Sequence, residues 1–139
     1  MTISRHVLKL HTHHEGELID ITNQVQNAIK EFKSYDGVAF LFVPGSTAAL
    51  TTIEFEPRLE KDFPAALERL VPKTIQYEHE KTWHDGNGHS HVKASLLGPD
   101  LTIPFQNGEL SLGTWQQIAF VELDTRPRDR TVIIQLLAE

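Results

Sequence analysis

The 139-residue sequence contains no cysteine, which excludes disulfide bonds, thiolate nucleophiles and thiolate metal ligands. It has no apolar run near the ~20 residues of a membrane-spanning helix. Its first residues, MTISRHVLKLH, lack the apolar centre of a signal peptide. Basic residues are the minority, 13 against 19 acidic ones, whereas a nucleic-acid-binding surface is usually basic. We therefore expect a cytoplasmic protein that binds neither nucleic acid nor membranes.

The remaining composition, 40% hydrophobic and 23% charged, is that of an ordinary globular protein. A chain of this length can bury a hydrophobic core without further cross-links. The sequence shows no repeat, low-complexity tract or linker, so residues 1–139 are predicted to form a single domain. Its unusual feature is the presence of eight histidines, most of which are clustered.

Hydrophobic spacing predicts helices in the first half of the chain and strands throughout, most densely in the second half. One helix follows Thr22, and a second is expected between Glu56 and Pro72, with a break near Asp62 because Pro64 lies inside it. Strands are predicted at residues 3–10, 37–43, 46–54, 89–97, 101–105, 110–112, 115–123 and 131–137. The pattern indicates an α+β fold, a compact single domain of mostly antiparallel sheet(s) with two helices.

The sharpest local motif is His89-Ser90-His91-Val92-Lys93. In a strand, alternate side chains share a face, so His89 and His91 would project together and could bind one metal ion. Zinc commonly takes three protein ligands and a water, and His79, upstream of a loop with His84 and Asp85, would complete the set. The alternative is a group of exposed polar side chains around a loop.

The loop after residues 37–43 contains Ser46 and Thr47, whose hydroxyls could contact an anion. Glu54, at the end of the following strand, could act as a base or metal ligand. Taken alone, these residues are better explained by a surface turn with an edge carboxylate. His11, His13 and His14 are expected in a solvated turn.

Arg126, Arg128 and Arg130 recur with a period of two, so all three could face an oxyanion substrate. A charged, solvated turn is the alternative. Trp115 and Gln116 follow a Gly-Thr turn and could form a pocket wall, or else a core tryptophan with a glutamine at its rim.

Taken in order, these segments resemble the YjbQ family, long known as an uncharacterised protein family. The resemblance spans nearly the whole chain and rests on specific motifs. They are GSTAALT at 45–51, Glu54, YEH at 77–79, NGHSHVK at 87–93, SLLG at 95–98, Pro104, Gly108, GTWQ at 113–116, Glu122 and Arg128. It implies a compact α+β fold, a homotrimer with a site near subunit boundaries, and a histidine-bound metal, most often Zn. Members are commonly described as secondary thiamine-phosphate synthases.

One departure concerns the metal ligands. Many members carry a histidine at the position of Gly45, whereas this chain has His89 in addition to His91. Either His89 replaces the missing ligand, so that His79, His89 and His91 bind the metal, or the metal site is absent.

The resemblance therefore predicts an enzyme that joins a pyrimidine methyl diphosphate to a thiazole phosphate, with Zn, or with Mg accompanying the diphosphate. The alternatives are a metal-dependent hydrolase of a small phosphorylated substrate, with Glu54 or Asp85 as base, and a non-catalytic trimeric protein that binds a metal or anion. The predicted catalytic residues are Glu54, His91 and Arg128; the predicted substrate-binding residues are Ser46, Thr47, Lys93, Trp115, Gln116 and Arg130.

Overall fold

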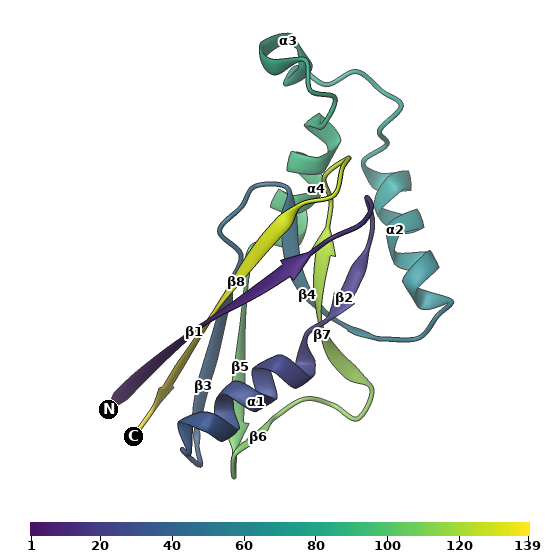
Figure 1. Cartoon of the computed structure of the whole chain (residues 1–139). Helices are drawn as coiled ribbons and strands as arrows, with labels where there is room; N and C mark the ends of the chain where they lie inside the picture. Colours follow the sequence, from purple (N-terminus) through teal and green to yellow (C-terminus); the bar gives the residue numbers. More distant parts are fainter.

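The computed structural model describes all 139 residues and contains eight strands and four helices (Figure 1). The strands are β1 (Thr2–His11), β2 (Leu18–Asp20), β3 (Gly37–Phe42), β4 (Ala48–Glu54), β5 (Asp100–Gln106), β6 (Glu109–Leu110), β7 (Gln116–Glu122) and β8 (Asp129–Ala138). The helices are α1 (Thr22–Phe32), α2 (Leu59–Leu70), α3 (Glu80–Trp83) and α4 (Gly88–Leu97).

The strands form two antiparallel sheets, which confirms the predicted α+β class. The larger sheet has the order β1-β8-β3-β5-β6, and the smaller has the order β2-β7-β4. In the smaller sheet Ala48 lies opposite Glu122, and Glu54 lies opposite Gln116. This register fixes which predicted functional residues meet at each end of β4 and β7.

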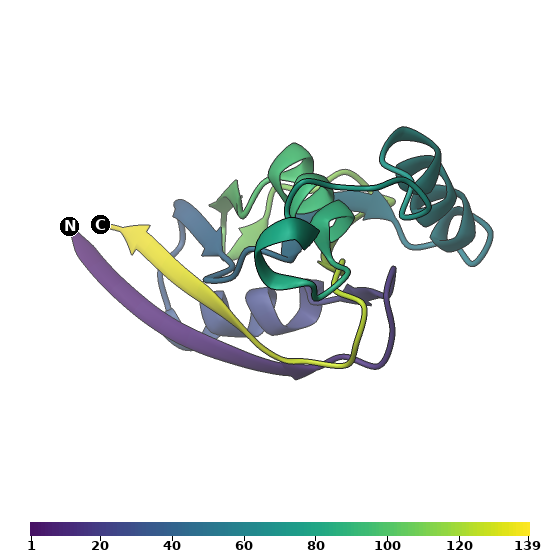
Figure 2. The same cartoon turned by 90° about the horizontal axis from the view of Figure 1, so that it is seen from above.

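The main hydrophobic core lies between α1 and the two sheets. Val25, Ala28 and Ile29 form the buried stripe of α1 and join one cluster with inward-facing residues of β8 such as Ile134. Figure 2 shows β1 and β8 curving around α1. No helix in this structure is long and apolar enough to cross a membrane.

The outer face of the larger sheet carries no helix and exposes several large apolar side chains. Ile3 and Val7 on β1 are 62% and 53% exposed, and Phe40 and Phe42 on β3 are 41% and 46% exposed. The pairing register places β8 between them, with Val7 opposite Ile133 and Ile133 opposite Phe42. Two apolar rows therefore cross this face, and a row that contains Arg5 and Gln135 separates them.

Two of the sequence predictions are wrong. Residues 89–97 form helix α4 rather than a strand, because Ala94 and Leu97 pack against the smaller sheet at helical spacing and Gly98 ends the helix. Helix α2 continues through Pro64 without the expected break. A short helix, α3, also forms in the polar segment before α4.

Candidate functional site

Two buried carboxylates at the end of β7 organise one end of the molecule. Glu122 is fully buried and Asp124 is 1% exposed. Glu122 accepts a 2.6 Å hydrogen bond from the Thr12 hydroxyl and two from the Arg130 guanidinium, at 2.9 Å and 2.5 Å. These hydrogen bonds of Glu122 to Thr12, which directly follows β1, and to Arg130 on β8 connect the larger sheet to β7 of the smaller one.

Asp124 pairs with Arg128 in the same way. Its carboxylate accepts hydrogen bonds from Arg128 Nε at 3.0 Å and Nη2 at 2.5 Å, from the Thr47 hydroxyl at 3.1 Å, and from the Thr125 N–H at 2.8 Å. Burial alone would raise the pKa of Asp124, but these bonds outweigh it and lower the pKa to about 2. Asp124 is therefore an anion at neutral pH.

Arg130 is mainly a structural residue. Its side chain is 11% exposed and is held by Glu122 and by Thr47, whose hydroxyl accepts from Nη2 at 2.9 Å. A Cβ atom on Gly45 would lie 3.3 Å from Arg130 Nη1. A side chain at position 45 would thus contact the guanidinium. Because Arg130 and Thr47 are held by these contacts, they have little freedom to bind a substrate as predicted.

Asn87, at the N-terminus of α4, connects Asp124 to the segment that carries His79. Its amide nitrogen reaches Asp124 Oδ1 at 3.4 Å, or, with the amide turned over, His79 Nε2 at 3.2 Å and Asp85 Oδ1 at 2.8 Å. The shorter distances favour the second orientation. Because Asn87 is 6% exposed, its amide in this orientation fixes the position of His79 relative to Asp85.

The rings of His79 and His91 lie together, with centroids 4.6 Å apart. His79 Nε2 is also 3.5 Å from the Asp85 carboxylate. Beside these residues, a cavity of about 130 Å³ is lined by Asp85, Asn87, Asp124, Thr125, Arg126 and Arg128. Arg126 and Arg128 thus line a small polar cavity, and the His79–His91 pair lies next to its Asp85 wall. We call the cavity and this histidine pair the histidine–arginine centre.

His89 does not join this centre. Positions 89 and 91 point in nearly opposite directions on a helix, and the buried His89 ring forms an ion pair through Nε2 with the Glu15 carboxylate. No three His, Asp or Glu side chains in the chain are grouped so that they could hold a metal ion. The expected convergence of His79, His89 and His91 is therefore wrong, because it relied on a strand where the chain forms a helix.

Lys93 and Ser46 also lie apart from the cavity. Lys93 is 5% exposed, and its ammonium donates to Glu68 Oε2 at 2.9 Å. This hydrogen bond lowers the pKa of Glu68. Ser46 lies exposed on the loop before β4. The helix gives Lys93 the role of joining α4 to α2 rather than facing a ligand.

Glu54, Trp115 and Gln116 lie at the opposite end of the smaller sheet. β4 spans seven residues, which at ~3.3 Å per residue separates Thr47 from Glu54 by about 20 Å. Glu54 and Trp115 line a different cavity of about 430 Å³. Within one chain, the predicted site residues therefore belong to two separate regions.

The sequence reasoning missed Thr12, Asn87 and Asp124, and gave Glu122 no role. One signal was available: Glu122 and Asp124 recur with a period of two at the end of an apolar strand, and Arg128 and Arg130 repeat that period after the turn. Charged side chains at the buried end of an apolar strand need partners of opposite charge. Two acidic residues before a turn and two basic residues after it therefore indicate ion pairs across the turn rather than a solvated loop.

Comparison with known proteins gives a consistent family. The sequence pattern described as UPF0047 protein YjbQ-like matches residues 6–139. A UPF0047 protein of Archaeoglobus fulgidus is 41% identical over 94% of this chain and 98% of its own length. YugU of Bacillus subtilis is 36% identical over 94% of this chain and 96% of its own length.

Solved structures share the fold over the whole chain. A crystal structure from Sulfolobus solfataricus, described as a YbjQ-like protein of unknown function, has a TM-score of 0.89 at 29% identity and covers 99% of this chain and 100% of its own. An uncharacterised YjbQ/UPF0047 protein from Clostridium acetobutylicum has a TM-score of 0.86 at 40% identity, covering 94% of this chain and 98% of its own.

Proposed function

This chain belongs to the UPF0047 protein YjbQ-like family, and from that premise we propose that it is a secondary thiamine-phosphate synthase acting at the histidine–arginine centre. The reaction joins a pyrimidine methyl diphosphate to a thiazole phosphate. The observation that carries the proposal is the placement of the His79–His91 pair beside a cavity walled by Arg126 and Arg128.

The reaction is a displacement with a clear charge requirement. The thiazole ring nitrogen donates its electron pair to the methylene carbon, a C–N bond forms, and the C–O bond breaks as diphosphate leaves with its electron pair. The barrier falls when the developing negative charge meets fixed cationic donors and the two reactants are held in line. The residues of the centre supply such donors.

Each residue has a specific role in this proposal. Arg128 gives Nε and Nη2 to Asp124, which leaves Nη1 for a phosphate oxygen. Arg126 is exposed and makes no ion pair within the chain, so its full charge is available. His79 and His91 would donate hydrogen bonds to the leaving diphosphate, with His79 positioned by Asn87.

The predicted zinc site does not fit the donor set of this chain, because Glu15 holds His89. The proposed reaction therefore uses no zinc, and zinc binding stays a prediction that metal analysis after chelation would test. Magnesium enters the proposal only as the ion that accompanies the diphosphate substrate.

We further propose that the protein works in the cytoplasm as a homotrimer. The uncovered apolar face formed by Ile3, Val7, Phe40 and Phe42 supports self-association. Exposed apolar patches of this kind commonly mark protein interfaces.

The test is turnover of both substrates in the presence of Mg²⁺, with thiamine phosphate detected by mass spectrometry. We expect His91→Ala and Arg126→Met each to lower kcat/KM at least about tenfold, as loss of a charged donor in a displacement does. Arg69→Met is the matched control, because Arg69 is an exposed arginine at the end of α2 outside the centre.

Other results would select the alternatives. Hydrolysis of a phosphate ester that is lost in His91→Ala and depends on zinc would indicate a metal-dependent hydrolase. Binding of diphosphate without turnover of any substrate would indicate a non-catalytic binding protein. Synthase activity that is unaffected by His91→Ala and Arg126→Met would contradict the placement of the site.

A further inference from the structure

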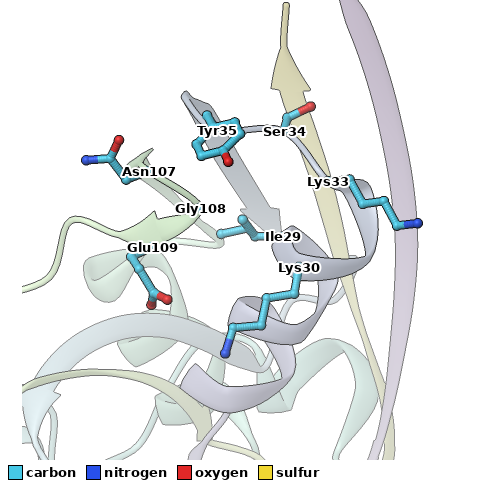
Figure 3. A pocket seen from close by; sticks show the side chains of 8 residues that line it. All are labelled: Ile29, Lys30, Lys33, Ser34, Tyr35, Asn107, Gly108 and Glu109. Atoms are coloured by element: carbon cyan, nitrogen blue, oxygen red, sulfur yellow. The ribbon is translucent and has the colours of Figure 1, made fainter.

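A third cavity, unrelated to the histidine–arginine centre, lies between the end of α1 and the β5–β6 hairpin. Figure 1 places these elements at the end of the molecule opposite α3 and the start of α4. The cavity measures about 320 Å³, within the usual range for small-molecule sites. Figure 3 shows the residues that line it.

Hydrogen bonds brace the walls of this cavity. Gln26 on α1 donates from Nε2 to the Gly108 carbonyl at 2.7 Å and accepts from the Leu110 N–H at 3.0 Å. The Gly108 N–H donates to the Tyr35 carbonyl at 2.7 Å. The hairpin is thus tied to both sides of the helix end, and the cavity is formed before any ligand arrives.

One part of the cavity is apolar and aromatic. Ile29 is fully buried within the core beneath it. Gly108 has a φ of +74°, and a Cβ atom there would meet nothing within 4 Å, so the turn leaves the space open. Tyr35, 75% exposed, provides an aromatic surface beside it. A planar ring could pack here.

The opening carries one charge of each sign. In Figure 3 the Lys30 and Glu109 side chains extend toward the same side of the cavity, while the side chain of Lys33, which also lines the cavity, extends in another direction. Lys30 and Glu109 form no ion pair with each other or with any other residue in the chain. The cavity also adjoins the C-terminal end of α1, where the helix dipole favours a positive group.

We propose that this cavity binds a free amino acid with an aromatic side chain. The ligand carboxylate pairs with Lys30, its ammonium pairs with Glu109 and the end of α1, and its ring packs on the Tyr35 ring in the space that the Gly108 turn leaves open. A zwitterion of this kind satisfies both unpaired charges and the exposed aromatic surface at once. A ligand with only one charge leaves Lys30 or Glu109 without a partner.

The experiment is an NMR titration of the isotope-labelled full chain with L-phenylalanine. We expect shifts confined to residues 26–36 and 105–110, and weaker binding to 3-phenylpropanoate and to phenethylamine, each lacking one charge. Lys30→Met and Glu109→Gln should each weaken phenylalanine binding about tenfold, the effect of one charged hydrogen bond. Lys33→Met is the matched control and should leave affinity unchanged.

The two single-charge ligands make the test specific. Lys30→Met should not weaken phenethylamine further, and Glu109→Gln should not weaken 3-phenylpropanoate further, because each variant removes the partner of a group that the ligand already lacks. The proposal fails if phenylalanine shifts no cavity residue up to its solubility limit, or if Lys33→Met weakens binding as much as Lys30→Met. Neither result bears on thiamine-phosphate synthesis.

Discussion

Replacing Asp124 by asparagine tests the buried ion pairs that support the histidine–arginine centre. The pKa of Asp124 is lowered from 3.8 to about 2. A difference of roughly 1.8 units at about 1.4 kcal/mol each corresponds to roughly 2.5 kcal/mol of folding free energy. Because the variant also leaves the Arg128 guanidinium without its anion, we expect a loss of about 2–4 kcal/mol at neutral pH.

The pH dependence gives this prediction its sign. A carboxyl with a depressed pKa stabilises the fold above its unfolded value, and the contribution is lost as pH falls from about 4 to about 2. In urea unfolding, the difference in unfolding free energy between the wild-type chain and Asp124→Asn should therefore be constant near neutral pH and decrease as pH falls through this range. A free-energy difference that is the same at pH 7 and at about pH 2, or that is below about 1 kcal/mol at pH 7, would refute the reasoning.

Three further predictions concern other parts of the chain. Glu15→Gln and His89→Gln should each lower the free energy of unfolding measured in urea. Because the two side chains form one ion pair, the loss in the double variant should differ from the sum of the single losses by about 0.5–3 kcal/mol. Additive losses would contradict that pair. Gly88→Ala should cost roughly 1–3 kcal/mol in thermal unfolding, because its Cβ atom would lie 2.5 Å from Tyr77 Cβ; an unchanged melting temperature would contradict the close packing of α4 against this segment. If the proposed trimer forms through the outer face of the larger sheet, Phe40→Ser together with Phe42→Ser should reduce the mass measured by light scattering toward that of a monomer, whereas Leu70→Ser, at an exposed apolar residue on α2, should not. A wild-type mass equal to one chain would contradict the proposed trimer, and a trimer mass that the first variant leaves unchanged would place the interface elsewhere.

Much of the fold could be predicted from local patterns. The strands predicted at residues 3–10, 101–105 and 131–137 correspond to β1, β5 and β8, because the hydrophobic patterns of strands depend on near neighbours. The segment 89–97 was misread for a related reason. Two histidines two positions apart fit a strand, but Ala94, Leu96 and Leu97 favour a helix.

The candidate site was harder to predict, because its contacts join distant parts of the chain. The arginines were visible in the sequence, but the Thr12–Glu122 hydrogen bond spans 110 residues and the Thr47–Asp124 hydrogen bond spans 77. No local period reports such pairs. The separation of Glu54 and Trp115 from Arg128 also follows from strand pairing. Glu54 lies opposite Gln116 at one end of β4 and β7, whereas Ala48 lies opposite Glu122 at the other end, from which the chain continues to Arg128.

The most direct test of the account is whether inorganic diphosphate with Mg²⁺ binds at the histidine–arginine centre, followed by NMR of the histidine, arginine and tryptophan side-chain nitrogens. The account predicts that signals of His79, His91, Arg126 and Arg128 shift together, with those of His11 and the Trp115 indole unchanged. Shifts of the Trp115 indole while the His79 and His91 signals stay fixed would contradict it and place the anion site at the other end of the smaller sheet.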